Sequence, residues 1–189
     1  MDSATKQTVI SAVIGGLAAL TIAFAAKKIR CKLRNKRGGH HHWRSQSELI
    51  TLDSNNMPAA IGPYTKGKMV KLSDGSALAW SSGQLGLDPK SNDLVTGEDN
   101  VVAQAEQVLK NLKALAEDNG FDLEKHTVKN TVYLTDMADF NKVNQVYMKY
   151  YRGGENPYPA RTCIAINALP KGGLVEIESV FFKPAEQRK

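Results

Sequence analysis

Two charged residues near the C-terminus lie in stretches that otherwise read as strands. Arg161 opens the stretch 161–166, and Glu176 lies within 175–180, where apolar residues alternate. Charged side chains rarely enter such surroundings unless they are paired. A guanidinium can grip a carboxylate through two parallel hydrogen bonds, and a carboxylate in a partly dry cleft can position water and carry a proton. The pair is therefore a candidate site for an anionic substrate; a salt bridge from Arg161 to a surface carboxylate is the alternative.

Two further residues share strand faces with this pair. Strand alternation puts Glu178 on the same face as Glu176, so spacing alone does not choose between the two carboxylates. Cys163 follows Arg161 by two residues and lies on its face. A nucleophilic thiolate needs a neighbouring base, and no histidine is close to Cys163 in the sequence. Packing, or a backbone contact in the cleft, is therefore the favoured role for Cys163.

The elements that must position these side chains follow from hydrophobic period and turn residues. The predicted order is β-β-α-β-α-β-β. Its parts are strands over 68–72 and 77–82 around a turn at 73–76, a loop over 87–98, a helix from Asp99 or Asn100 to Gly120, a strand over 127–135, a helix capped by Asp136, and two strands around 169–173. Two helices can cover only one face of such a sheet. Self-association would cover the other face.

The positive charge of the chain is concentrated at its N-terminus. Residues 1–47 carry nine Lys or Arg and one acidic residue, a net charge of +8. The whole chain is +6, which leaves −2 for residues 48–189. That part lacks the basic face that a phosphate backbone requires, so no nucleic-acid partner is expected. Two cysteines, Cys31 and Cys163, make no disulfide framework and fit a reducing compartment.

An uncharged stretch of 19 residues, 8–26, predicts a membrane anchor. As a helix it spans roughly 28 Å, close to the ~30 Å hydrocarbon core. Seven basic residues follow in the eleven residues 27–37, and such a flank stays in the cytosol. The predicted organisation is a tail (1–7), an anchor (8–26), a basic linker (27–46) and a cytosolic domain (47–189). The mitochondrial outer membrane is favoured over the endoplasmic reticulum or peroxisome, and a cleaved targeting segment is the alternative.

Several separated motifs resemble those of the RidA family, also called YjgF or L-PSP proteins. The resemblance covers about residues 48–183. The motifs are Pro-Ala-Ala-Ile-Gly-Pro-Tyr at 58–64, Ser-Gly-Gln at 82–84, Asn-Leu at 111–112, Asp-Phe-x-x-Val-Asn-x-x-Tyr at 139–147, Pro-Ala-Arg-Thr-Cys at 159–163, Leu-Pro at 169–170 and Val-Glu-Ile-Glu at 175–178. Their common order makes the resemblance specific.

The resemblance implies an α/β (α+β) chorismate-mutase-like fold, with a mixed sheet, two helices on one face, and a homotrimer whose sheets form a central barrel. Three clefts would lie between subunits. The implied activity is that of a 2-iminobutanoate/2-iminopropanoate deaminase, which hydrolyses imino and enamino acids such as 2-aminoacrylate. No metal or organic cofactor is implied.

The resemblance also implies roles for individual residues. Arg161 would hold the substrate carboxylate, and the resemblance chooses Glu176 over Glu178 to hold the attacking water. The other residues expected to line the cleft are Tyr64, Ser82, Gly83, Asn144 and Cys163.

Two other functions stay open at this point. One is a non-enzymatic ligand-binding, chaperone or scaffold subunit of a membrane complex, with further partners in that complex. The other is an endoribonuclease or translation inhibitor, which is disfavoured because His126 is the only histidine of the domain.

Overall fold

The structure is a computed structural model that describes residues 47–154 and 157–186. The predicted tail, anchor and linker lie outside the described residues. Within the described part of the chain, no helix combines the length and apolar character needed to cross a membrane.

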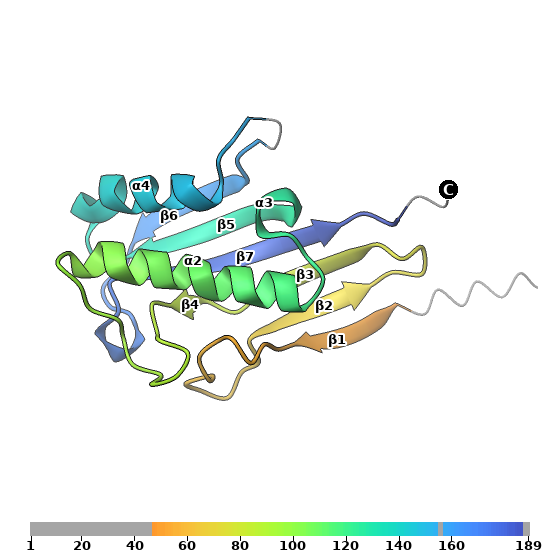
Figure 1. The fold of residues 1–189 in the computed structure, drawn as a ribbon, viewed down its shortest axis with the longest axis horizontal. Helices are drawn as coiled ribbons and strands as arrows, with labels where there is room; N and C mark the ends of the chain where they lie inside the picture. Colours follow the sequence, from red (N-terminus) through yellow and green to blue (C-terminus); the bar gives the residue numbers. More distant parts are fainter. Residues whose placement is uncertain (1–46, 155–156, 187–189) are drawn as a thin grey trace, which may run out of the picture. The chain divides into compact units, whose positions relative to one another are not determined.

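One mixed sheet forms the centre of the domain (Figure 1). Its order is β1-β2-β3-β7-β5-β6, with β4 paired to β7. The strands are β1 (Glu48–Leu52), β2 (Gly67–Lys71), β3 (Ala77–Ser81), β4 (Gln84–Leu85), β5 (Thr127–Leu134), β6 (Ala160–Ala165) and β7 (Val175–Lys183). Only the β5–β6 pair is parallel among the described strand pairs. A crossover containing a helix joins these two strands, as a parallel pair requires.

Two long helices cover one face of this sheet, as predicted (Figure 1). They are α2 (Asn100–Asp118) and α4 (Phe140–Tyr150). Asp99 caps the N-terminus of α2, because its side chain accepts hydrogen bonds from the backbone N–H groups of Val101 and Val102. The buried core between helices and sheet contains Val108, Leu109, Leu112 and Leu115 of α2, Val143 and Val146 of α4, and Ile177 and Phe181 of β7.

The sequence-based order omitted short elements. These are β1, β4, the single-turn helix α3 (Leu123–His126) and the 3₁₀ turns η1 (Met137–Asp139) and η2 (Pro170–Gly172). Strand β4, helix α3 and the two 3₁₀ turns carry too few residues to show a period, and the residues of β1, Glu-Leu-Ile-Thr-Leu, do not alternate strictly between polar and apolar. Asp136 caps η1 rather than α4 itself, through a bond from the Ala138 N–H. The chain then continues directly into α4, so the predicted cap is one 3₁₀ turn early.

On the face of the sheet away from the helices, the part around β3 and the C-terminal end of β7 carries apolar side chains that are uncovered in the single chain. Register places Phe182 opposite Leu78, and Trp80 opposite Val180. Trp80 and Phe182 are 42% and 41% exposed, and Leu49 of β1 is 68% exposed. Exposed apolar patches of this kind mark interaction surfaces. The pattern agrees with the expectation that another copy of the chain covers this face.

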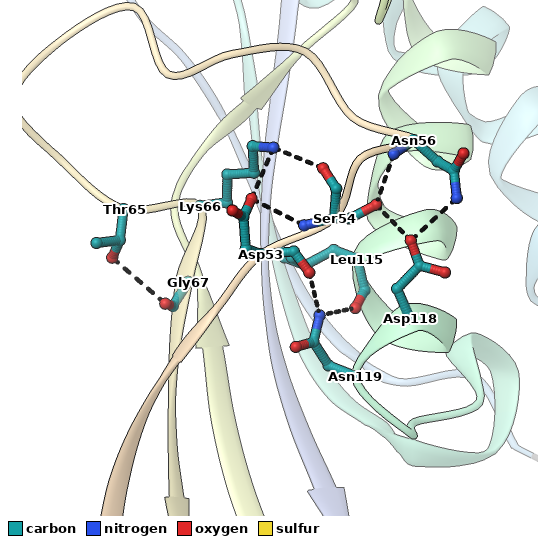
Figure 2. A network of polar contacts seen from close by, with 9 residues as sticks. All are labelled: Asp53, Ser54, Asn56, Thr65, Lys66, Gly67, Leu115, Asp118 and Asn119. Atoms are coloured by element: carbon teal, nitrogen blue, oxygen red, sulfur yellow. Dashed lines mark hydrogen bonds and ion pairs between the residues drawn. The ribbon is translucent and has the colours of Figure 1, made fainter.

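A polar network fastens the loop over 53–66 to the C-terminal end of α2 (Figure 2). Lys66 Nζ lies 2.8 Å from Asp53 Oδ1 and donates to the Ser54 carbonyl at 2.6 Å. The Ser54 hydroxyl donates to Asp118 Oδ2 of α2 at 2.6 Å. The loop carries Tyr64, so the network limits where that side chain can lie.

Candidate active site

Arg161 projects from the edge strand β6 toward the helices. It pairs in register with Asn130 of β5, which is fully buried beneath them. Its guanidinium carbon lies 4.9 Å from the ring centre of Tyr147 and 5.4 Å from that of Phe140. Guanidinium groups stack favourably on aromatic faces and leave their N–H edges free. Contrary to the sequence-based interpretation, β6 is mostly exposed rather than buried.

The Arg161 guanidinium faces a cavity of about 480 Å³. The cavity is lined by Asn141, Asn144, Gln145, Tyr147, Met148, Tyr158, Pro159 and Arg161. Among residues 47–154 and 157–186, no carboxylate lies within ion-pair distance of Arg161. A half-buried cation beside a cavity, without a carboxylate of its own, suits an anionic ligand. Of the two roles left open for Arg161, this arrangement favours ligand binding.

Asn144 and Cys163 belong to the same side of the sheet as Arg161. Asn144 of α4 lines the cavity directly. Cys163 packs against the core under the helices. Burial raises the pKa of the Cys163 thiol, and the nearby Arg161 charge only partly opposes this. A protonated, packed thiol agrees with the packing role expected for Cys163.

Glu176 lies on the opposite face of the sheet. In β7 it alternates with the buried Val175 and Ile177, which face the helices. The backbone of Gly83 lies against its carboxylate, and a Cβ added to Gly83 would come within 1.9 Å of Glu176 Oε1. Only glycine fits at position 83 with the carboxylate in this place. A small apolar cluster of Leu85, Leu87 and Leu169 adjoins it on this face, since Leu85 pairs with Glu176 in register.

The surroundings of Glu176 make its carboxyl hard to ionise. Burial, and secondarily the negative charge of Glu178, raise the pKa of Glu176. Glu178 lies on the same face, as predicted, and accepts a hydrogen bond from the Tyr133 hydroxyl at 3.3 Å. A raised pKa lowers the cost of binding a proton, so the carboxyl group can accept and return one more readily than an exposed glutamate.

Tyr64 lies near Gly83, and Ser82 directly precedes Gly83 in the sequence. Tyr64 is 44% exposed, and its hydroxyl accepts the Ile61 N–H at 3.3 Å. It lines a narrow pocket together with Gly83 and Lys66. Ser82 was expected to line the cleft, and its hydroxyl donates to the Thr65 carbonyl at 2.6 Å. In the single chain Ser82 therefore holds the loop that carries Tyr64.

Two amide side chains of helix α2 hold the backbone segments next to Gly83 and Glu176 in place. The amide of Asn111 donates to the carbonyls of Leu85 and Leu87, at 3.3 and 3.0 Å. Gln104 Oε1 accepts the N–H of Leu174, just before β7, at 2.8 Å. Both amides are buried, so they fix the two segments that bring Gly83 and Glu176 together.

The predicted site residues thus form two groups on opposite faces of the sheet. The group on the helix face, called the arginine half, is Arg161, Asn144 and Cys163. The group on the other face, called the glutamate half, is Glu176, Gly83, Tyr64 and Ser82. A single chain does not bring the two halves into one cleft.

Sequence reasoning missed part of the arginine half. Phe140 and Tyr147 were not among the predicted site residues, yet the Arg161 guanidinium stacks on both rings. Asn130 was not predicted as part of the site, although a polar residue that shares the alternating positions of Val132 and Leu134 in the strand over 127–135 was a usable signal. Across the described residues, no three His, Cys, Asp or Glu side chains gather as metal ligands.

Comparisons with known proteins agree with this fold. A family model described as Endoribonuclease L-PSP matches residues 54–182. The 2-iminobutanoate/2-iminopropanoate deaminase of Mus musculus is 42% identical over 129 residues, which cover 68% of this chain and 87% of that protein. The crystal structure of RidA from an Antarctic Psychrobacter superposes with a TM-score of 0.61 at 42% identity, covering 71% of this chain and 99% of that one. Escherichia coli TdcF with bound serine gives a TM-score of 0.61 at 30% identity, covering 71% and 99%.

Proposed function

Because the chain belongs to the Endoribonuclease L-PSP family, also called the RidA family, we propose that it hydrolyses reactive 2-imino acids and their enamine forms. The products are the 2-oxo acid and ammonia. The mouse relative is named a deaminase for 2-iminobutanoate and 2-iminopropanoate, which indicates the substrate class. We extend this to the present chain and propose 2-iminobutanoate and 2-iminopropanoate among its substrates.

The observation that carries the proposal is the Arg161 guanidinium. Stacked on Tyr147 and Phe140, it faces a cavity with no carboxylate of the described chain paired to it. The planar guanidinium would bind the carboxylate that every 2-imino acid carries, through two parallel hydrogen bonds. This fixes the imine carbon relative to the protein, and such positioning can account for much of the rate enhancement.

Glu176 would carry the proton in this reaction. It takes a proton from water as the water oxygen bonds to the carbon of the protonated imine, which leaves a neutral tetrahedral carbinolamine. It then returns that proton to the nitrogen, the carbon–nitrogen bond breaks and ammonia leaves, and the carboxylate accepts the hydroxyl proton as the carbonyl forms. The raised pKa of Glu176 suits both steps, since the group must accept and release a proton at similar pH.

Assembly would complete the cleft. We expect a homotrimer whose uncovered sheet faces pack together, burying Trp80 and Phe182. Each cleft would then take the arginine half of one chain and the glutamate half of the next. The opposite placement of the two halves in one chain is the reason for this expectation.

Membrane attachment is a separate proposal that rests on sequence alone. Residues 8–26 would anchor the protein, with residues 47–189 in the cytosol and the mitochondrial outer membrane favoured. The substrates would then be imines released at that surface.

The ribonuclease activity in the family description is less suited to these residues. Nδ1 of His126 accepts the Asp122 N–H at 2.8 Å, and burial lowers the pKa of His126. A histidine engaged in this way is a poor general acid. A scaffold function, in turn, does not require Arg161 to stack on two aromatic rings beside a cavity.

The test is an assay of the full chain in detergent and of the fragment 47–189. Each is mixed with an enzyme that generates 2-aminoacrylate, and ammonia release is compared with the uncatalysed rate. Arg161→Ala serves as the inactive control. A wild-type rate equal to that of Arg161→Ala would reject the proposal, and cleavage of a generic RNA by wild type alone would favour the ribonuclease.

A further inference from the structure

A row of polar side chains crosses the sheet beneath the helices. Arg161 of β6, Asn130 of β5 and Ser179 of β7 occupy paired positions in neighbouring strands. Asn130 and Ser179 are 0% and 1% exposed, in strands whose neighbouring inward residues Val132, Ile177 and Phe181 belong to the apolar core. A buried amide is costly unless its hydrogen bonds are made, so this one requires an explanation.

Both ends of the Asn130 amide are engaged. Its Nδ2 donates to the Tyr147 hydroxyl at 2.6 Å, and its Oδ1 accepts from the Ser179 hydroxyl at 2.6 Å. The backbone N–H of Ser179 donates in turn to the Ser81 hydroxyl at 2.8 Å. The network therefore ties the tip of Tyr147 on α4 to three strands of the sheet.

The ring of Tyr147 lies next to both the Arg161 guanidinium and the ring of Tyr151. Its centre lies 4.9 Å from the Arg161 guanidinium carbon and 4.5 Å from the ring centre of Tyr151. Without a bond at the hydroxyl, only packing would set the tilt of this ring. A tilted ring would move the surface on which the guanidinium rests.

We propose that Asn130 is a positioning residue, which acts through Tyr147 to orient the Arg161 guanidinium toward its anionic ligand. Asn130 touches neither substrate nor Glu176; it fixes the ring on which Arg161 stacks. The ligand part of this inference rests on the proposed function, since it takes Arg161 as the carboxylate-binding group. The positional part concerns the protein alone.

The kinetic test compares Asn130→Val and Tyr147→Phe in the full chain. Each removes one side of the same hydrogen bond, and Tyr147→Phe keeps the ring and the core. We expect each to raise KM for the imine, and the Kd of 2-oxobutanoate, by about tenfold, the order of a lost buried hydrogen bond. We expect kcat to fall by a smaller factor, because a tilted guanidinium also shifts the bound imine carbon, whereas Glu176 itself is untouched. The double variant should be no worse than Asn130→Val alone, since the bond between Asn130 and Tyr147 is lost in all three variants.

A matched control separates positioning from stability. Leu134→Val lies on the same strand and face as Asn130 and weakens the core without touching a polar group. It should lower Tm and leave KM unchanged. Equal Kd values for Asn130→Val and wild type, with a lowered Tm, would overturn the proposal. So would effects of Asn130→Val and Tyr147→Phe that multiply in the double variant.

A crystal structure of Tyr147→Phe decides the positional part without any assay of activity. We expect the Arg161 guanidinium to leave its place over the ring at position 147. An unchanged stacking distance would overturn the inference even if the enzyme is active. A displaced guanidinium in a protein that hydrolyses no imine would support the positioning role and reject only the proposed function.

Discussion

Arg161 and Glu176 point to opposite faces of the same sheet, with β5 between their strands. Arg161 stacks on rings of α4, and Glu176 lies among residues that the helices do not cover. If both act on one substrate molecule, they must come from different chains. The arrangement makes oligomer assembly a condition of catalysis rather than only of stability.

Mixing two inactive variants tests this condition. Arg161→Ala and Glu176→Gln should each be inactive alone, yet a mixture unfolded and refolded together should regain activity. With random assembly in a ring, about a quarter of the clefts combine an intact arginine half with an intact glutamate half. The expected rate is therefore about a quarter of wild type. Mixing without refolding is the control, and no recovery after verified co-assembly would place both residues in one chain's site.

Arg161→Lys should be nearly as damaging as Arg161→Ala. Lysine keeps the charge but offers no planar fork and stacks poorly on Tyr147 and Phe140. Two charge-assisted bonds of ~1.5–3 kcal/mol each are at stake, so we expect kcat/KM to fall by at least about a hundredfold. Circular dichroism and Tm should show a retained fold. Lysine activity within about threefold of wild type would show that charge alone suffices.

Local patterns were enough to predict the main elements of the fold. The apolar period of α2 and its stop near Gly120, whose φ is +79°, appear in the structure where they were expected. The RidA-type fold is confirmed by the solved structures that superpose on the chain. The short strand β4 was missed because two residues carry no period, although it holds Gly83 against Glu176.

The division of the site could not be read from the motifs. Strand alternation correctly paired Glu176 with Glu178 and Arg161 with Cys163. Alternation within one strand does not show whether Arg161 of β6 and Glu176 of β7 lie on the same face of the sheet, because that depends on the register of both strands with β5. The aromatic support of Arg161 was likewise hidden, since contacts between α4 and β6 are set by tertiary packing. Helical period showed only that Tyr147 faces inward.

Gly83→Ala should impair catalysis through Glu176. The added Cβ would lie within 1.9 Å of Oε1, so the carboxylate must move. A displacement of about 1 Å can cost on the order of a hundredfold in rate, and we expect kcat to fall at least tenfold. Gly97→Ala, in the loop before α2, is the control and should change little. A Gly83→Ala variant with normal kcat would mean that the position of this carboxylate is not critical.

The pH profile should respond to Glu178. The charge of Glu178 helps to raise the pKa of Glu176, so Glu178→Gln should lower it. If Glu176 must be ionised to activate water, activity is lost as pH falls through that pKa. The acid limb of kcat/KM should therefore move to lower pH in Glu178→Gln, while burial keeps it above the ordinary value for glutamate. A limb that moves upward, or stays fixed, would assign it to another group.

Removal of residues 1–46 should leave catalysis intact while abolishing membrane attachment. The first residue of β1, Glu48, lies level with Lys183, the last residue of β7, because the register runs from Glu48 to Lys71, from Lys71 to Ala77 and from Ala77 to Lys183. Glu176 lies seven residues earlier in β7, about 23 Å along the strand. The N-terminal segment therefore joins the domain far from the glutamate half. We expect kcat/KM of the fragment 47–189 to stay within about twofold of the full chain in detergent.

The full chain, in contrast, should resist extraction by alkaline carbonate, because residues 8–26 are long enough to span a bilayer. Protease added to intact organelles should digest the domain, since the basic run 27–37 favours the cytosolic side. A variant with the seven basic residues of this run changed to Gln should lose that fixed orientation while keeping the span. If the domain of the wild-type chain is protected until the membrane is opened, the orientation is reversed or the segment is an import signal. The substrates would then be imines formed inside the organelle.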